Sequence, residues 1–509
     1  MRRKHPYFKH WIWALAVFGL TGCMSAADYR PPDTSKHMAE RWHTDLLEGH
    51  TALDSGQQPM TAWWRRFNDE ELSRLIGKLS GSSLTLAEAR ERILEAYARR
   101  GIARADAKLQ VAASAGYTHA EAGDEAVSFQ GPPPGSSADL FSAGAAAEWE
   151  LDLWGRNKRL VEAADADIEA ASADYRSMLV SLSAELALAY IDLRTLRTRM
   201  DMVRENISLQ EKTLALAEKR LASGVGTALE VARTRHLLDS TRARIPELER
   251  GAGAARNRID LLLGARPGET QLDPGSMPEM PELIGVGIPM DLMTRRPDIS
   301  AGVLRYRAAV ARTGAAKADK YPRLSLSGIL NLQSDSLDGL FDPDSLIYSL
   351  GPGLHFPLFT GGRIESRIQQ QVSRAEQARL ALSRKIIEAL SEVETAAIGV
   401  VRTQEQVREL RSAEVSALES VDLADALFRS GLGDMFQVLD AEKQQVSARE
   451  SLLLARQRAL SEVVRLYRAL GGGWETEQTD GNGMTASVRA GAGPLQAFRT
   501  SEKNQRSER

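Results

Sequence analysis

The sequence has a single cysteine, few aromatic residues and no long apolar run. With one thiol, Cys23, among 509 residues, no disulfide can form within the chain. Aromatic residues make up 6% of the chain, while Ala, Leu, Arg and Glu dominate it, which favours long helices. Beyond residue 20, no run approaches the roughly 18 apolar residues that indicate a membrane-spanning helix. These absences leave a helix-rich chain without internal disulfides.

An excess of charge of one sign and the common catalytic motifs are missing as well. Lys and Arg total 65 and Asp and Glu total 68, a formal net charge of −3, so nothing indicates a nucleic-acid partner. The sequence contains no HExxH, GxSxG, P-loop or CxxC motif. The histidines beyond the first ten residues are His37, His43, His50, His119, His236 and His355. The first three could approach a metal, but surface polar positions explain them better, so we expect no enzyme and no metal or cofactor site.

The N-terminus has the layout of a secretory signal. The basic stretch MRRKHPYFKH precedes the apolar run 11–20, which is half the length of a membrane span. The residues LTGC at 20–23 resemble the bacterial lipobox, in which the cysteine is acylated and becomes the new N-terminus. We therefore expect a signal peptide over 1–22 and a covalent lipid on Cys23, and by the same resemblance Met24 favours sorting to the outer membrane. The alternative is a buried or stray thiol.

The chain contains an internal duplication with an offset of 207 residues. The matching stretches are SGVG at 223–226 and SGLG at 430–433, GR at 155–156 and 362–363, and LG at 263–264 and 470–471. Because three separate landmarks keep the same spacing, the mature chain consists of two related halves.

Between these landmarks, apolar residues recur at steps of three and four, as in helices that pack along their length. The pattern predicts long helices over 157–222 and 363–429, each ended by a glycine pair that lets the chain turn back. Return helices are expected at about 228–264 and 436–471. A helix at about 85–109, opened by a capping box at Thr85 and Glu88, would stack end to end with the first return helix. Pro246 should kink or break that return helix.

Before each long helix the apolar period changes to two. This predicts strands over about 111–120, 144–155, 323–334 and 346–359. One apolar and one polar face suit a transmembrane β-barrel, and a soluble half-buried hairpin pair is the alternative. Since the smallest membrane barrels have about eight strands, four strands in a membrane would require several chains to share one barrel. Two copies would supply eight strands and three copies twelve.

Several motifs are more specific than this periodicity. They are CMSAADYRPP after the lipobox, WWRRFNDEELSRLI and LDLWGR in the first half, and GIPMDLMTRRPDISAGVLRYRAAVARTGAAKADKYPRLSLSG, FPLFTGGR, LFRSGLGDMFQVLDAEKQ and RLYRALGGGW in the second. Together they cover about 15–474 and resemble the TolC-like outer-membrane efflux proteins, in the lipoprotein branch of the OprM and NodT type.

The resemblance implies a mainly α fold with a β-barrel part. Duplicated long helical hairpins would form a trimeric α-barrel, and four strands per chain would contribute to a 12-stranded transmembrane β-barrel. The expected protein is a homotrimer in the outer membrane that extends into the periplasm. It would bind a periplasmic adaptor and an inner-membrane pump of the RND type, and export drugs or other toxic compounds. The alternative function is a structural periplasmic coiled-coil lipoprotein without a channel.

The implied division of the chain follows the duplication. Residues 1–22 are the signal peptide, 23–83 a lipidated N-terminal and equatorial segment, 84–284 and 285–474 the two efflux repeats, and 475–509 a polar tail that we expect to be disordered.

The glycine turns and the residues after them are the candidate functional sites. By resemblance, the tips that dock the adaptor consist of Gly224, Val225, Gly226, Gly431, Leu432 and Gly433. The alternative is that these glycines only cap helices, and one loop can do both. Also by resemblance, Phe436 and Asp440 form the narrowest part of the tunnel, with Asp434 a further candidate. Carboxylates on solvated helix surfaces are the alternative there.

Overall fold

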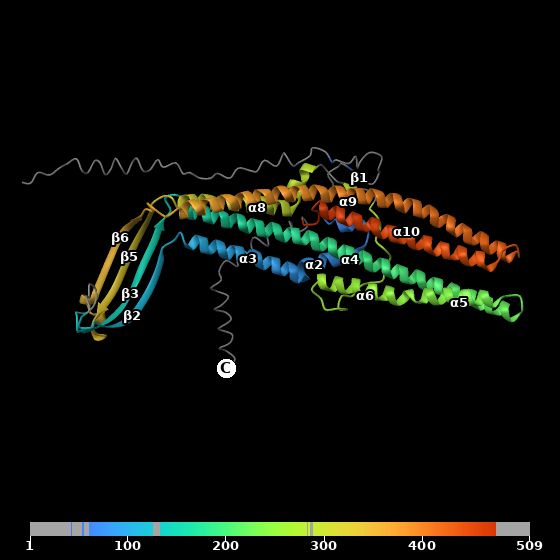
Figure 1. Cartoon of the computed structure of the whole chain (residues 1–509), viewed down its shortest axis with the longest axis horizontal. Helices are drawn as coiled ribbons and strands as arrows, with labels where there is room; N and C mark the ends of the chain where they lie inside the picture. Colours follow the sequence, from blue (N-terminus) through green and yellow to red (C-terminus); the bar gives the residue numbers. More distant parts are fainter. Residues whose placement is uncertain are drawn as a thin grey trace, which may run out of the picture. The chain divides into compact units, whose positions relative to one another are not determined.

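The computed structural model describes residues 42, 53–54, 61–125, 133–281, 284–285 and 289–474 (Figure 1). The described chain forms two compact units. One contains Arg92–Ser172 and Ala301–Leu382, and the other contains Ala173–Ser300 with the described parts of Thr34–Glu91 and Ser383–Arg509. The expected signal peptide, the lipidation site Cys23 and the polar tail all lie outside the described residues.

The first unit contains one antiparallel sheet. Its strands β2 (Gln110–Glu121), β3 (Ser137–Leu151), β5 (Arg323–Ser334) and β6 (Leu346–His355) pair in the order β2-β3-β5-β6. Short 3₁₀ turns, Asp338–Phe341 and Pro343–Ser345, connect β5 to β6. Within the described residues, β2 and β6 each have one strand neighbour, so both are edge strands.

The register gives this sheet two chemically different faces. Trp149 lies opposite Leu326, which lies opposite Pro352. One residue further along, Glu148 lies opposite Ser327, which lies opposite Gly351. Because side chains of directly paired residues share a face, apolar side chains gather on one face and small or polar ones on the other. The alternation expected from the sequence is confirmed, with Ile329 and Ile347 exceptions on the polar face.

Three strand boundaries differ from the expectation by four residues or more, and one of them is the end of the second strand, at Leu151 instead of 155. The second strand begins at Ser137, seven residues before the expected 144, because this extension is fully paired with β2, from Ser137 opposite Glu121 to Ala143 opposite Ala115. The fourth strand ends at His355 instead of 359. Pro357 follows two residues later and has no N–H to continue a ladder.

Long helices extend from this unit into the second one. They are α3 (Leu84–Ala105), α4 (Arg156–Ala222), α8 (Pro297–Ala318) and α9 (Arg363–Arg429). Within the first unit, α4 and α8 meet through buried alanines at 163, 166, 308 and 311, which allow close approach. The buried carboxylate of Asp319 forms ion pairs with Arg156, Arg323 and Arg367. Trp154 stacks on Tyr321, with ring centroids 4.9 Å apart.

The second unit contains the greater part of two helical hairpins and several short elements. The remaining elements are β1 (Leu53–Asp54) parallel to β4 (Ile284–Gly285), a 3₁₀ turn (Trp63–Phe67), α2 (Glu70–Ser82), α5 (Ala228–Arg242), α6 (Arg244–Leu262), a 3₁₀ turn (Pro289–Asp291), α7 (Leu292–Arg295) and α10 (Met435–Ala469). In Figure 1 the end of α4 turns back into α5 and α6, and the end of α9 turns back into α10. We call α4 with α5 and α6 the first hairpin, and α9 with α10 the second hairpin.

The first return helix is broken where a proline requires it. Helix α5 ends at Arg242, and α6 begins at Arg244 after Ala243. Pro246 cannot donate a hydrogen bond to the carbonyl four residues earlier, at Arg242, and its ring crowds that carbonyl. In the second hairpin, α10 runs unbroken through the equivalent residue, Leu453. The expected interruption at Pro246 is confirmed.

Each return helix ends against an upstream helix. A Cβ at Gly264 would lie 2.6 Å from the carbonyl oxygen of Ser82, at the end of α2, and 3.5 Å from the backbone nitrogen of Leu84, where α3 begins. A Cβ at the equivalent Gly471 would lie 3.1 Å from the carbonyl oxygen of Arg295, beside the start of α8. Both glycines have positive φ, 68° and 76°. The expected end-to-end stacking is therefore present in both halves, and these close approaches leave no room for a side chain.

The capping box expected at Thr85 and Glu88 is wrong. Helix α3 begins at Leu84, so Thr85 already lies inside its first turn. Ser83, with extended backbone, separates α3 from α2, which the sequence pattern did not reveal as a separate helix. A capping box does form at Thr227 and Glu230, at the start of α5.

None of the helices within the described ranges is both long and apolar enough to cross a membrane.

Candidate functional site: the hairpin tips and the contacts between hairpins

Both hairpin tips have the same backbone geometry. In the first, Gly224 has φ 74° and donates to the carbonyl of Leu221, while Val225 donates to that of Arg220. In the second, Gly431 has φ 79°, and the same two hydrogen bonds run from Gly431 and Leu432 to residues 428 and 427. This is the Schellman arrangement, in which a left-handed residue lets two orphan carbonyls of the helix end find donors.

The second glycine of each tip is needed for a different reason. A Cβ at Gly226 would lie 2.9 Å from the backbone carbon of Arg220. A Cβ at Gly433 would lie 3.1 Å from the Cβ of Leu427 and 2.8 Å from the side-chain oxygen of Gln437. Gly224 and Gly431 therefore cap their helices, whereas Gly226 and Gly433 are required because a side chain there would clash with the preceding helix. Of the six expected tip residues, Val225 and Leu432 are left with exposed side chains, 67% and 81% accessible.

Phe436 is covered by an arginine of the other hairpin. It lies in the first turn of α10 and is half-buried. The guanidinium carbon of Arg233, on α5, lies 4.5 Å from its ring centroid, which is a cation–π contact. Nearer the turns, Arg220 of α4 lies 5.2 Å from the ring of Phe428 on α9. The sequence pattern did not reveal these pairs, although the offset of 207 places Arg233 at the position equivalent to Asp440.

The two candidate aspartates have different surroundings. Asp440 is exposed, and its carboxylate accepts a hydrogen bond from Gln444, 2.7 Å away. Asp434 is the N-cap of α10 and accepts from the backbone N–H of Gln437 at 2.9 Å. Asp434 therefore caps α10. Asp440 lies one helical turn after Phe436, and its side chain is exposed to solvent.

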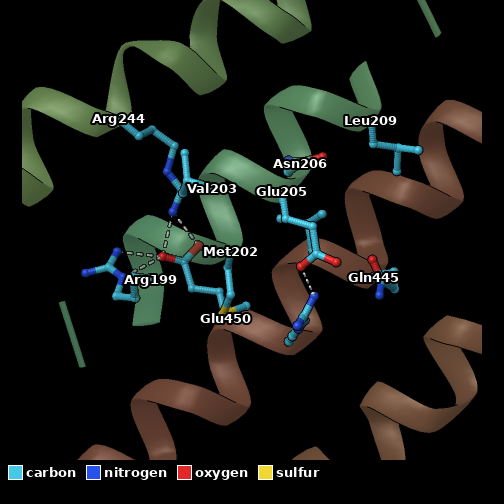
Figure 2. A pocket seen from close by; sticks show the side chains of 11 residues that line it. Arg199, Met202, Val203, Glu205, Asn206, Leu209, Arg244, Gln445 and Glu450 are labelled. Carbon is cyan, nitrogen blue, oxygen red and sulfur yellow. Dashed lines mark hydrogen bonds and ion pairs between the residues drawn. The ribbon is translucent and has the colours of Figure 1, made fainter. Parts of the chain in front are cut away.

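A three-helix ion cluster joins the hairpins farther from the tips (Figure 2). In the view, the carboxylate of Glu450 on α10 points between Arg199 of α4 and Arg244, the first residue of α6. Arg199 Nε donates to Glu450 Oε1 over 3.1 Å, and Arg244 donates to both carboxylate oxygens. Burial raises the pKa of Glu450, but hydrogen bonds and charge from Arg244 and Arg199 outweigh it, so the pKa lies below its usual value. We call these three residues the Glu450 clamp.

A cavity of about 140 Å³ lies beside the clamp. It is bounded by the clamp and by a second ion pair, Arg449 with Glu205, whose nitrogen and oxygen are 2.9 Å apart. Met202 and Leu209 of α4 also line it (Figure 2). Ion pairs between the hairpins therefore lie on either side of this cavity.

No group of His, Cys, Asp or Glu residues able to hold a metal ion occurs in the described part of the chain.

Comparison with known proteins agrees with this geometry. The family model described as outer membrane efflux protein matches residues 75–265 and 288–472, one stretch in each half. The chain is 30% identical over 466 residues to outer membrane protein OprJ of Pseudomonas aeruginosa, covering 91% of this chain and 95% of that protein. It is 28% identical over 483 residues to nodulation protein T of Rhizobium leguminosarum bv. viciae, covering 94% and 96%.

A solved structure of the outer-membrane channel OprN superposes on the chain with a TM-score of 0.80. The two are 30% identical, and the match covers 89% of this chain and all of the other. The mainly helical class with a small sheet is confirmed, and the fold is that of TolC-like channels, a trimeric α-barrel with a β-barrel. The chain belongs to the outer membrane efflux protein family and is an outer-membrane exit duct of tripartite efflux systems.

Proposed function

We propose that three copies of this chain form the duct, that a periplasmic adaptor docks at its hairpin tips, and that an inner-membrane pump of the RND type delivers drugs or other toxic compounds to it. The observation that carries the proposal is the four-stranded sheet with one apolar face and two edge strands, β2 and β6. In hydrocarbon every backbone N–H and C=O needs a partner, and each unpaired group costs several kcal/mol. Pairing β6 of one copy with β2 of the next satisfies both edges.

Docking at the tips is supported by the exposed side chains of Val225 and Leu432. Each lies in the turn at the end of a hairpin, next to a glycine that has no room for a side chain. An exposed aliphatic residue on a rigid turn offers apolar area to a partner at little cost in conformational entropy.

The duct itself needs no catalytic group and no cofactor, because the energy for transport comes from the pump. We propose that this chain is not an enzyme and that its covalent modification is the lipid on Cys23. Replacing Cys23 by Ser should abolish acyl labelling. With a cleavable signal replacing residues 1–22, trimers should still reach the outer membrane, because the strands insert independently of the anchor.

The function is tested by reconstituting the purified full-length protein in planar bilayers and by recovering tagged protein from outer membrane with its partners. A duct gives discrete conductance steps and brings down one adaptor and one inner-membrane pump. A structural coiled-coil lipoprotein would give neither conductance nor a pump, and that pair of results would overturn the proposal.

A further inference from the structure

The two hairpins are held together in different ways near their tips. In the first, ion pairs link its two helices, Arg235 with Glu218 and Arg242 with Glu211, over 2.9 and 2.6 Å. The offset of 207 residues identifies the equivalent positions in the second hairpin. Glu442 and Asp425 stand where Arg235 and Glu218 stand in the first, so an attractive pair is replaced by two carboxylates.

The second difference lies one level farther from the tip. The residue equivalent to Arg242 is Arg449, but the equivalent of Glu211 is Leu418, which offers no charge. Arg449 instead pairs with Glu205 of the first hairpin, and the adjacent Glu450 forms the clamp. In the described part of the chain, α10 is therefore joined to the first hairpin by ion pairs at 449–450, while its segment toward the tip has no counterpart of the ion pairs that link α4 to α5.

The surroundings of Glu442 favour proton uptake. Its side chain is half-buried on α10. Burial, followed by the charge of Asp425, raises its pKa above the ordinary glutamate value of 4.5. Asp425 is itself paired with Arg429 of the same helix over 2.8 Å. On α10, the charged residues within two positions of Glu442 in the sequence are Asp440 and Lys443. On α5, the guanidinium of Arg233 lies over the ring of Phe436.

We propose that the tip half of the second hairpin is a proton-responsive element: with Glu442 and Asp425 both ionised it loosens, and when Glu442 takes up a proton from the periplasm it closes. The first hairpin, linked by Arg235 and Glu218, stays closed throughout. Because α10 also carries Phe436 and Asp440, loosening of this segment would widen the duct. This last step rests on the proposed function, whereas the difference in looseness between the hairpins does not.

The direction of the pH effect follows from linkage. An acid whose pKa is raised in the packed state holds its proton more tightly there than in the loosened state. The stability that protonated Glu442 gives to the packed state is therefore fully present below pH 4.5, the ordinary glutamate pKa. It is lost as the pH rises through the raised pKa of Glu442. The second hairpin should be tight in acid and loose at neutral pH.

Amide hydrogen exchange on the full-length protein in detergent tests this directly. At pH 7.5, Glu442→Gln should slow exchange in 418–429 and 435–449 by roughly two- to fivefold relative to the wild type, because the substitution removes a half-buried charge and, with it, the repulsion from Asp425. At pH 4.5 the difference should disappear. Comparing proteins at one pH cancels the intrinsic pH dependence of exchange.

Matched variants separate this effect from general surface charge. Glu419→Gln, on an exposed residue of α9, should leave exchange unchanged. Glu442→Arg should restore a pair like that of the first hairpin and protect the second, while Arg235→Glu should loosen the first. Equal exchange in wild type and Glu442→Gln at pH 7.5, or the same protection from Glu419→Gln, would overturn the inference. Bilayer conductance reports separately on the duct, so its absence beside a positive exchange result would count against the proposed function alone.

Discussion

The guanidinium of Arg233 lies over the ring of Phe436, with the guanidinium carbon 4.5 Å from the ring centroid. Arg233 belongs to the first hairpin and Phe436 to the second, so the residue expected at the constriction is held by its neighbouring hairpin. The offset of 207 places Arg233 at the position equivalent to Asp440, so the duplication has put a cation and an anion at the same place in the two tips.

A double-mutant cycle measures this contact. We expect Arg233→Gln and Phe436→Leu to couple by about 0.5–1 kcal/mol in unfolding of the assembled protein, the usual range for a partly exposed cation–π pair. The Arg220 and Phe428 pair, at 5.2 Å, is the control and should couple less. Additive effects of the first two substitutions would show that the contact does not hold Phe436.

The expected constriction can be tested by conductance. Phe436→Ala combined with Asp440→Ala should raise single-channel conductance in a planar bilayer, because a large apolar side chain and a carboxylate are removed from each copy. Asp440→Asn alone should weaken block by divalent cations added on the periplasmic side. Leu229→Ala, at the position equivalent to Phe436, is the control. A double variant that conducts like the wild type would place the narrowest part elsewhere.

Docking and capping at the tips can be separated. Gly224→Ala should destabilise the first tip by about 1–2 kcal/mol, because its φ of 74° is unfavourable for a residue with a Cβ. Val225→Ser with Leu432→Ser should leave thermal unfolding unchanged but reduce the adaptor recovered with tagged protein, since both side chains are exposed. Unaltered adaptor recovery would restrict these loops to a capping role.

The stability contributed by the Glu450 clamp should fall in acid, whereas the packing around Glu442 should tighten in acid. A carboxyl with a depressed folded-state pKa contributes stability above its ordinary value of 4.5, and loses it as pH falls through the depressed pKa. We expect Glu450→Gln to lower stability at pH 7 by about 1–3 kcal/mol, as for hydrogen bonds to charged groups, and to have little effect in strong acid. Glu205→Gln, in an exposed pair, is the control and should cost less than about 1 kcal/mol. A pH-independent loss would indicate a packing effect instead.

The sequence predicted the periodic parts of this fold well, for physical reasons. The helix expected over 363–429 spans Arg363–Arg429, because its apolar period and the flanking glycines act locally. The extension of β3 back to Ser137 was missed because apolar and polar residues do not alternate in SADLFSAG. These residues are extended because they pair with β2. Helix α2 was missed because it is short and is separated from α3 by a single residue, Ser83.

Contacts between the hairpins were not predictable in the same way. Two such contacts are the cation–π pair of Arg233 with Phe436 and the ion pairs of Glu450 with Arg199 and Arg244. They depend on how remote segments pack against each other, and the apolar period of one helix carries no information about that. Comparing charges across the duplication would have drawn attention to Arg233 and to the acidic pair at 425 and 442. It would not have revealed the clamp, whose glutamate is equivalent to Ala243, the residue at the helix break.

The number of chains that share one barrel is the measurement that tests the account most directly. Mass determination of the full-length protein, extracted from outer membrane in mild detergent, should give three copies at every concentration at which the protein remains folded. Three copies satisfy both edge strands in a closed 12-stranded barrel, since each chain supplies four. A stable, folded monomer with β2 and β6 unpaired would contradict the account.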